Sequence, residues 1–201
     1  IPVIVATTTN PTDDAIVVEA ERLGARVFRG SEHDVLSRFA GAVREFSLDT
    51  VVRITSDCPL IDGHLIRTGV DRFLEIGDGD AYVSNVIERT FPRGFDFEVF
   101  SAASLNEADQ RAAQEADREH VTPYLHQNRS GRTVFSHITR SPDASRYRVT
   151  LDTTDDLTAL RTLIEAFDAA HLDAEGIIDL LDAHPELVSI NAHVEQKKLG
   201  E

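Results

Sequence analysis

The sequence predicts an α/β fold whose sheet is mainly parallel. Two observations support this prediction. Short apolar runs rich in β-branched residues alternate with longer segments in which apolar residues recur at helical spacing. The stretch Val51–Asp62 is the clearest run, because it begins apolar and β-branched and stops abruptly at Pro59, which cannot continue a ladder of hydrogen bonds. Such alternation is typical of right-handed βαβ units, which place parallel strands in one sheet.

The individual elements follow from this pattern in chain order. Asp13 or Asp14 suits the N-cap of the first helix, and Gly24 suits its end. Strands are expected at residues 2–7, 26–29, 51–56, 81–85, 95–100, 133–140 and 147–151. Helices are expected at residues 13–23, 34–46, 64–76, 103–116, 118–127, 154–167 and 174–183, the last ended by Pro185.

Composition narrows the class of protein. The chain has 201 residues, 41% hydrophobic and 27% charged, which suits one globular domain over residues 1–201. The net charge of −15 argues against binding to nucleic acid polymers or anionic membranes. No apolar run is long enough to span a bilayer, and no signal peptide is evident. A single cysteine excludes an internal disulfide, so we expect a cytoplasmic protein.

Asp57 and Asp152 share one pattern, in which an apolar strand is followed by an aspartate and then by the start of a helix. If the two strands are parallel neighbours, both carboxylates lie at the carboxyl edge of the sheet, where ligands bind in open α/β folds. Two carboxylates at such an edge suit Mg²⁺, which takes few protein oxygens. Each aspartate could equally be only a helix cap, and spacing alone leaves the two readings balanced.

Two other residues lie in the Val51–Asp62 stretch. Arg53 is expected to be buried, and a buried arginine needs a partner. It could contact a phosphate or form an ion pair with an acid of the core. Cys58 has no basic neighbour in the sequence that would lower its pKa, so a packed small side chain is favoured over a nucleophile.

The segment between residues 117 and 127 is rich in polar side chains. The spacing of His120 and His126 does not place them on one helical face, and Pro123 disturbs the turn, so a zinc site is rejected. The trio Arg118-Glu119-His120 could be a helix cap with surface pairs, or a contact with substrate or with a second subunit. Among phosphate-binding fingerprints, neither the Rossmann nor the P-loop motif is present.

Several segments in order match motifs of a known family. Val51–Asp62 resembles "R-x-T-G-D-C-P-L-I-D", and Asp117–Tyr124 matches "D-R-E-H-V-T-P-Y". Three further matches are Val27–Phe39 with "R-G-S-x-x-D-V-L-x-R-[YF]", Ser84–Phe100 with "S-N … P-x-G-x-D-x-E-[VI]-F", and Arg148–Leu157 with "R-x-T-[LV]-D-x-x-x-D-L". The chain therefore resembles the SpsF-like cytidylyltransferases, which are relatives of the CMP-Kdo and acylneuraminate (CMP-sialate) synthetases.

This resemblance implies a fold and an activity. The fold is the Rossmann-like nucleotide-diphospho-sugar transferase fold, a mainly parallel sheet with helices on both faces. The activity is transfer of CMP from CTP to an acidic sugar or related acceptor, with release of pyrophosphate. The resemblance also implies a homodimer, because relatives commonly form one.

The resemblance assigns roles to residues one by one. Asp57 and Asp152 take the Mg²⁺ role, and Arg53 joins them as a catalytic candidate. The nucleotide side would hold Ser31, Asp34, Arg38 and Ser56. The acceptor side would hold Asp96, Glu98, Arg118, Glu119 and His120, with Asp96 and Glu98 on one face of an alternating strand that puts Phe95, Phe97 and Val99 on the other.

Two departures from the family pattern bear on function. Ser56 replaces the usual glycine before the aspartate and narrows the approach of substrate to backbone. The family also opens with a strand and a loop of the type A-R-x-x-S-x-R-[LF]-P-x-K that holds the triphosphate, and residue 1 corresponds to the family's second strand. We therefore expect that roughly 30 residues, one βα unit, are missing before Ile1.

Two rival functions follow from these departures. The acceptor could be a phosphonate or another non-sugar molecule, since the acceptor residues are the least certain. Alternatively, the chain could be a non-catalytic domain that binds nucleotide sugars or a partner and lacks the phosphate loop.

Overall fold

The computed structural model describes residues 2–195, which fall into two compact units. The first unit contains residues 2–51 and 100–134, and the second contains residues 52–99 and 135–195. The chain passes between the units inside two strands, β3 (Thr50–Arg53) and β5 (Glu98–Ser101). The expectation of a single domain over residues 1–201 stays a prediction.

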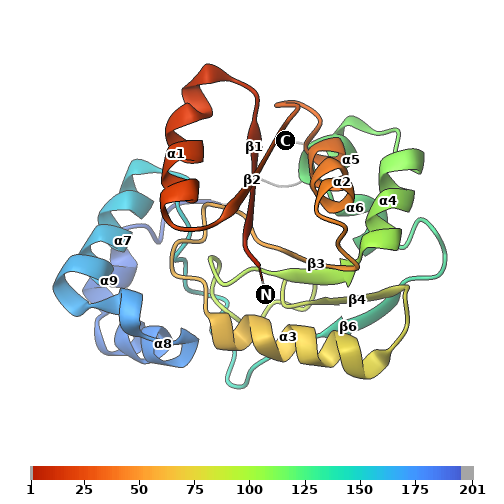
Figure 1. Ribbon diagram of the computed structural model, residues 1–201. Coiled ribbons are helices and arrows are strands. Elements are labelled where there is room, and N and C mark those ends of the chain that lie inside the picture. Colours follow the sequence, from red (N-terminus) through yellow and green to blue (C-terminus); the bar gives the residue numbers. More distant parts are fainter. Residues whose placement is uncertain (1, 196–201) are drawn as a thin grey trace. The chain divides into compact units, whose positions relative to one another are not determined.

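The first unit begins with two parallel strands joined through a helix. Ile4 pairs with Arg26, and the register continues to Thr8 and Gly30. The helices before and after the second strand both pack on this pair, and Figure 1 shows them on its opposite sides. The elements are β1 (Ile4–Thr8), the 3₁₀ turn η1 (Pro11–Asp13), α1 (Asp14–Arg22), β2 (Arg26–Gly30) and α2 (Val35–Glu45).

The turn after β1 is held by one carboxylate. Asp13 Oδ2 accepts hydrogen bonds from Thr7 Oγ1 and Thr8 Oγ1, both at 2.7 Å, and from the Thr8 N–H at 3.0 Å. These bonds lower the pKa of Asp13 to about 2. The helix α1 then ends before Gly24, whose φ of +77° favours glycine, as the sequence predicted.

The rest of the first unit is helical and corrects one prediction. In place of the two helices expected over residues 103–116 and 118–127, the chain forms α4 (Ala102–Arg111), α5 (Glu115–His120) and α6 (Pro123–His126). The break lies at Val121, where φ is +72° and ψ is −51°, and the Thr122 N–H donates to the His120 carbonyl at 2.8 Å. Pro123 then starts the next helix at a position where no N–H is needed.

A four-stranded sheet has the order β3-β5-β4-β6, where β4 is Ala81–Ser84 and β6 is Val134–His137. The Ala102 N–H, just after β5, bonds to the carbonyl of Asp49, just before β3, so β5 runs antiparallel to β3. The Ile138 N–H, just after β6, bonds to the carbonyl of Ser84 at the end of β4, so these two strands are parallel. The predicted α/β fold is confirmed, with one antiparallel strand in this sheet.

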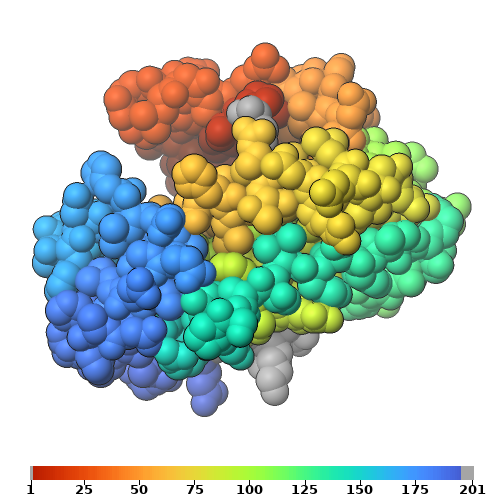
Figure 2. Space-filling model, turned by 90° about the horizontal axis from the view of Figure 1, so that it is seen from below, coloured from red at the N-terminus to blue at the C-terminus, as the bar shows by residue number. Residues whose placement is uncertain are grey.

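The core of the second unit is formed by α3 (Gly63–Ile76), β4, the chain leading into β5, residues 144–149 and the helices that close the unit. Gly69 lies so close to the Phe97 ring that an added Cβ would come within 2.2 Å of it, so only glycine fits there. Figure 2 shows the outer surface of α3 beside the segment around β6, and Arg72 of α3 donates a hydrogen bond to Ser136.

One prediction about the second unit is wrong in detail. Residues 147–151 do not form a strand. A single parallel bridge joins Arg148 to Arg93, but the Leu151 N–H bonds to the Asp57 carbonyl and the Phe95 N–H bonds to the Pro92 carbonyl, so neither N–H extends the ladder. The strand β5 is buried along its whole length, Glu98 included. The helix over residues 174–183 ends before Pro185, as predicted, and Pro185 then begins a further short helix.

The second unit closes with helices. They are α7 (Thr154–Phe167), the 3₁₀ turn η2 (Ala169–His171), α8 (Ala174–Ala183) and α9 (Pro185–Ser189). Thr153 and Asp156 form a capping box at the start of α7, since each side chain bonds to the backbone N–H of the other. Within residues 2–195, every helix is too short or too polar to cross a membrane.

Candidate active site

Asp57 lies in the turn after β3, beside the segment that carries Asp152. The Leu151 N–H donates to the Asp57 carbonyl at 2.8 Å. Thr150 Oγ1 donates to the same carbonyl at 3.0 Å and lies 3.1 Å from the Asp57 carboxylate. The structure therefore places the segment from Thr150 to Asp152 against Asp57, although no strand precedes Asp152. The two segments are therefore adjacent through turn contacts instead of strand pairing, and a shared site of the two carboxylates stays a prediction.

Arg148 holds the Asp152 carboxylate in place. Its Nη2 donates to Asp152 Oδ2 at 2.5 Å and to Asp156 Oδ2 at 2.9 Å, while its Nε donates to Asp156 Oδ1 at 2.8 Å. The Asp156 side chain is completely buried, whereas the Asp152 side chain is 40% exposed. Arg148 therefore connects an exposed carboxylate to a buried anchor at the start of α7.

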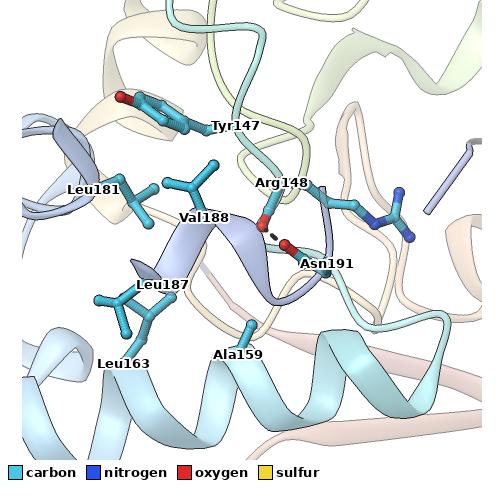
Figure 3. A pocket seen from close by; sticks show the side chains of 8 residues that line it. All are labelled: Tyr147, Arg148, Ala159, Leu163, Leu181, Leu187, Val188 and Asn191. Atoms are coloured by element: carbon cyan, nitrogen blue, oxygen red, sulfur yellow. Dashed lines mark hydrogen bonds between the residues drawn. The ribbon is translucent and has the colours of Figure 1, made fainter. Parts of the chain in front are cut away.

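Asn191 completes this anchor from the other end of the unit. Its Nδ2 donates to Asp156 Oδ1 at 2.8 Å and to the Arg148 carbonyl at 3.3 Å. Figure 3 shows Asn191 and Arg148, with the hydrogen bond between them, at the polar end of a small pocket, whose other walls are side chains such as Leu163, Leu181 and Val188. Burial raises the pKa of Asp156, but the bonds from Arg148 and Asn191 outweigh it and hold the pKa well below its usual range.

Three arginines and two aspartates, the half-buried Asp96 and the exposed Asp152, lie on the 89–96 and 147–152 segments. Arg89 forms a two-pronged ion pair with Asp96, at 2.6 and 2.8 Å. Arg93 lies opposite Arg148 in the parallel bridge, and the charges of Arg89, Asp96, Arg148 and Asp152 all act on its guanidinium. Burial first, and then the positive charges of Arg89 and Arg148, lower the pKa of Arg93.

Arg53 and Glu98 form a buried ion pair. Arg53 Nη1 lies 2.5 Å from Glu98 Oε2, and the Tyr82 hydroxyl donates to Glu98 Oε1. The Arg53 side chain is 17% exposed and that of Glu98 is 6% exposed. Of the two readings of Arg53, this geometry favours the ion pair with a core acid. It also favours a structural role for Glu98, whose two oxygens are both engaged inside the core.

In the first unit the structure brings together four residues that the sequence marked. The Asp34 N–H bonds to Ser31 Oγ, and Arg38 Nη1 donates to the Ser31 carbonyl. Asp34 caps α2 by accepting from the Ser37 N–H, and two nitrogens of Arg118 donate to its carboxylate at 2.8 and 2.6 Å. Burial opposes these bonds, but Arg118 lowers the pKa of Asp34.

The remaining predicted residues differ in exposure. Glu119 and His120 have side chains 64% and 41% exposed and lie 4.0 Å apart, just before the turn at Val121. Ser56 is exposed in the turn after β3. Cys58 is buried, and burial raises the pKa of its thiol to about 12, which confirms that it is a packed side chain.

The sequence model described as Cytidylyltransferase matches residues 2–180. This chain belongs to the cytidylyltransferase family. The resemblance noted from the motifs is thereby confirmed at the level of the family, and the protein is a nucleotidyltransferase by membership.

Individual relatives agree with this membership. An uncharacterized protein of Methanocaldococcus jannaschii is 38% identical over 99% of this chain and 80% of its own length. The spore coat polysaccharide biosynthesis protein SpsF of Bacillus subtilis is 29% identical over 91% of this chain and 75% of its own length. A solved cytidylyltransferase from Leptospira borgpetersenii superposes with a TM-score of 0.87 at 31% identity, covering 97% of this chain and 80% of that one.

Sequence reasoning missed two residues of the site, Arg148 and Arg93. Arg148 occurs in one of the family motifs, but the sequence assigned it no role. Its spacings of four residues to Asp152 and eight residues to Asp156 were the only sequence signals of a contact with these acids. Arg93 sits at a variable position of the motif, so no sequence pattern singles it out. Both were found only through the bridge that places residues 93 and 148 opposite each other.

Proposed function

We propose that this chain transfers the cytidylyl group of CTP to an acidic sugar of the Kdo or sialic-acid type and releases pyrophosphate. One observation carries the proposal. In a chain of the cytidylyltransferase family, Asp57 and the Thr150–Asp152 segment are held together after β3. The name of the SpsF relative, which refers to polysaccharide biosynthesis, supports a role in making glycan precursors.

The residues fit a magnesium ion as cofactor. Mg²⁺ binds oxygen atoms, commonly through one or two carboxylates together with substrate phosphates. Asp57 and the 40% exposed Asp152 offer such a pair, and Arg148 leaves Asp152 at the surface while fixing its position. Bound there, the ion would neutralise the charge that builds up on the phosphates during transfer.

The proposed reaction is an in-line displacement. An acceptor hydroxyl oxygen forms a bond to the α-phosphorus of CTP, the bond from that phosphorus to the bridging oxygen breaks, and pyrophosphate departs with the negative charge. The hydroxyl proton passes to solvent or to a nearby carboxylate. The protein holds the acceptor hydroxyl in line with the departing pyrophosphate, and such positioning supplies much of the rate enhancement in enzymes of this kind.

The proposal is tested with Asp57→Asn and Asp152→Asn, each compared with Asp155→Asn as a matched control. Asp155 is a neighbouring carboxylate, 51% exposed, that pairs with His193. Pyrophosphate release from CTP and Mg²⁺ is measured with a panel of sugar acids and phosphonates, and Mn²⁺ binding is measured separately by electron paramagnetic resonance.

We expect both site variants to lose at least 100-fold in turnover and to bind Mn²⁺ more weakly, as expected for ligands of a catalytic ion. The control should behave like the wild type. Normal pyrophosphate release by either site variant would disprove the metal assignment. Turnover with phosphonates but with none of the sugar acids would show that the acceptor is a phosphonate instead of an acidic sugar.

A further inference from the structure

Arg93 is the one half-buried arginine in residues 2–195 whose guanidinium has no partner within those residues. The other arginines with half-buried side chains form hydrogen bonds, most of them to carboxylates, as Arg89, Arg118 and Arg148 do. Arg93 contributes only backbone bonds, which run from its N–H to the Tyr147 carbonyl and from the Val149 N–H to its own carbonyl. In a chain with a net charge of −15, a half-buried guanidinium that forms no hydrogen bond within the described residues needs an explanation.

The root of this side chain is fixed. The two backbone bonds measure 3.1 and 2.7 Å. The next residue, Gly94, has a φ of +105°, and a Cβ there would come within 2.5 Å of the Val149 carbonyl oxygen. The backbone around Arg93 therefore packs against residues 147–149, which fixes the point from which the side chain starts.

The direction of the side chain follows from the bridge. Arg93 and Arg148 lie opposite each other in a parallel bridge, so their side chains leave on the same side. Along an extended chain every second residue shares a face, which adds Thr150 and Asp152 to this side. Thr150 does reach Asp57, and Arg148 does reach Asp152, as this alternation requires.

The charges of Asp96 and Asp152 attract the Arg93 guanidinium, but each of these carboxylates is already paired with another arginine. Asp96 is neutralised by Arg89, and Asp152 and Asp156 are neutralised by Arg148. Partial burial and the like charges of Arg89 and Arg148 make the unpaired guanidinium costly, because its solvation is incomplete. An anion from outside the chain would supply the missing partner, and the planar fork of arginine suits phosphate and carboxylate equally well.

We propose that Arg93 binds an anionic group of a substrate beside Asp57 and Asp152, either a phosphate of the nucleotide or the carboxylate of the acceptor. The inference deepens the proposed cytidylyl transfer and rests on it for the identity of the substrates. Because Arg93 occupies a variable position of the family motif, this contact would belong to the specificity of this chain rather than to the shared reaction.

The test compares Arg93→Gln with Arg93→Lys and with Arg67→Gln, an exposed arginine of α3 in the same unit. Calorimetric titration measures the binding of CTP, of pyrophosphate, and of Kdo and N-acetylneuraminic acid together with their methyl esters, all in the presence of Mg²⁺. The acid and its ester differ in one charge, so their affinity ratio reports whether the carboxylate is recognised.

We expect Arg93→Gln to weaken one ligand class by about 10- to 100-fold, the usual range for a lost charge-assisted hydrogen bond. If CTP and pyrophosphate bind more weakly while the affinity ratio of acid to ester is unchanged, the group bound by Arg93 is a phosphate. If the preference for the acid over its ester is lost while the affinity for CTP is unchanged, the group bound by Arg93 is the acceptor carboxylate. Arg93→Lys should recover part of the loss, and Arg67→Gln should bind as the wild type does.

A structural role would give a different result. Since the guanidinium has no partner within residues 2–195, ligand-free Arg93→Gln should melt at the wild-type temperature or above it. A lower melting temperature with unchanged binding would overturn the inference, as would a wild type that binds none of these anions. A wild type that binds them through Arg93 yet releases no pyrophosphate would leave the Arg93 contact standing and refute the proposed reaction.

Discussion

Replacing Arg148 by glutamine should destabilise the protein more than any ordinary surface change. The Arg148 side chain is 9% exposed and makes a two-pronged ion pair with Asp156, whose side chain is fully buried. Without the guanidinium, the buried Asp156 carboxylate keeps only neutral donors, namely Asn191, the Thr153 hydroxyl and the N–H groups at the start of α7. The dominant effect is therefore the desolvation of an unpaired charge.

Removing one partner of a buried ion pair costs about 3–5 kcal/mol. A domain of ordinary stability has about 5–15 kcal/mol in total, so this loss is a large fraction of it. The matched control is Arg22→Gln, which breaks an exposed pair with Glu19 one turn away on α1, with side chains 64% and 57% exposed. Exposed pairs contribute less than about 1 kcal/mol, so the control should unfold almost as the wild type does.

The assay is urea unfolding followed by far-ultraviolet circular dichroism, since the chain has no tryptophan for fluorescence. The difference between wild type and Arg148→Gln should also depend on pH. The folded-state pKa of Asp156 lies well below its unfolded value of 3.8, so its ionic stabilisation is fully present above 3.8 and is lost progressively as the pH falls from 3.8 through the folded-state pKa. The difference should therefore be largest near neutral pH and should shrink in acid.

A loss no larger than that of Arg22→Gln, or a difference that does not change between neutral pH and pH 3, would refute this reasoning. The first result would mean that water or another group replaces the guanidinium beside Asp156. The second would mean that the stability carried by Arg148 is packing of its aliphatic part instead of charge.

Two further predictions follow from single residues. Burial raises the pKa of the Cys58 thiol to about 12. The thiol should therefore react with 5,5′-dithiobis(2-nitrobenzoate) at least 100-fold more slowly in the native protein than in urea. Equal rates would contradict the buried placement. Gly94→Ala should lower the free energy of unfolding by more than about 2 kcal/mol in the same urea assay, because the φ of Gly94 is +105° and the added Cβ would lie 2.5 Å from the Val149 carbonyl oxygen. Gly79→Ala is the control, since a Cβ added there would have no atom within 4 Å. Equal losses for the two variants would contradict the close approach at Gly94.

Local signals in the sequence predicted most of the elements. Gly24 ends α1, Asp34 caps α2, and Thr153 with Asp156 caps α7, all through contacts within a few residues. The failures lie where a distant partner or a backbone constraint decides. The helix expected over residues 118–127 breaks at Val121, which has a positive φ that no signal in the sequence predicts.

The alternating pattern of residues 95–100 placed Asp96 and Glu98 on one face but did not show whether that face is exposed to solvent. The strand β5 lies inside the four-stranded sheet, and all of its residues are buried. A charged residue is possible there because Arg53 and Tyr82 satisfy Glu98. Both partners come from other strands, so the burial of Glu98 could not be read from its own segment.

The site was predictable in part, for physical reasons. Asp57 and Asp152 were found because strand, aspartate and helix start form a local pattern, but their nearness depends on Thr150 and Leu151 bonding to the turn after β3. These bonds join residues 93 or more positions apart in the chain. A pattern within one segment cannot report such a contact.

The same physics explains why the arginines matter more than the sequence suggested. Asp152 is exposed and lies just before a helix, so by itself it would be a mobile carboxylate with little reason to face Asp57. Arg148 ties it to Asp156, and Asp156 is fixed by the capping box and by Asn191, so the position of an exposed group is set by a buried one. The parallel bridge then brings Arg93 to the same side with its charge unmatched within residues 2–195. The candidate site therefore consists of Asp57, which is contacted by Thr150, and Asp152, which is fixed by Arg148, together with a second arginine available for an anion.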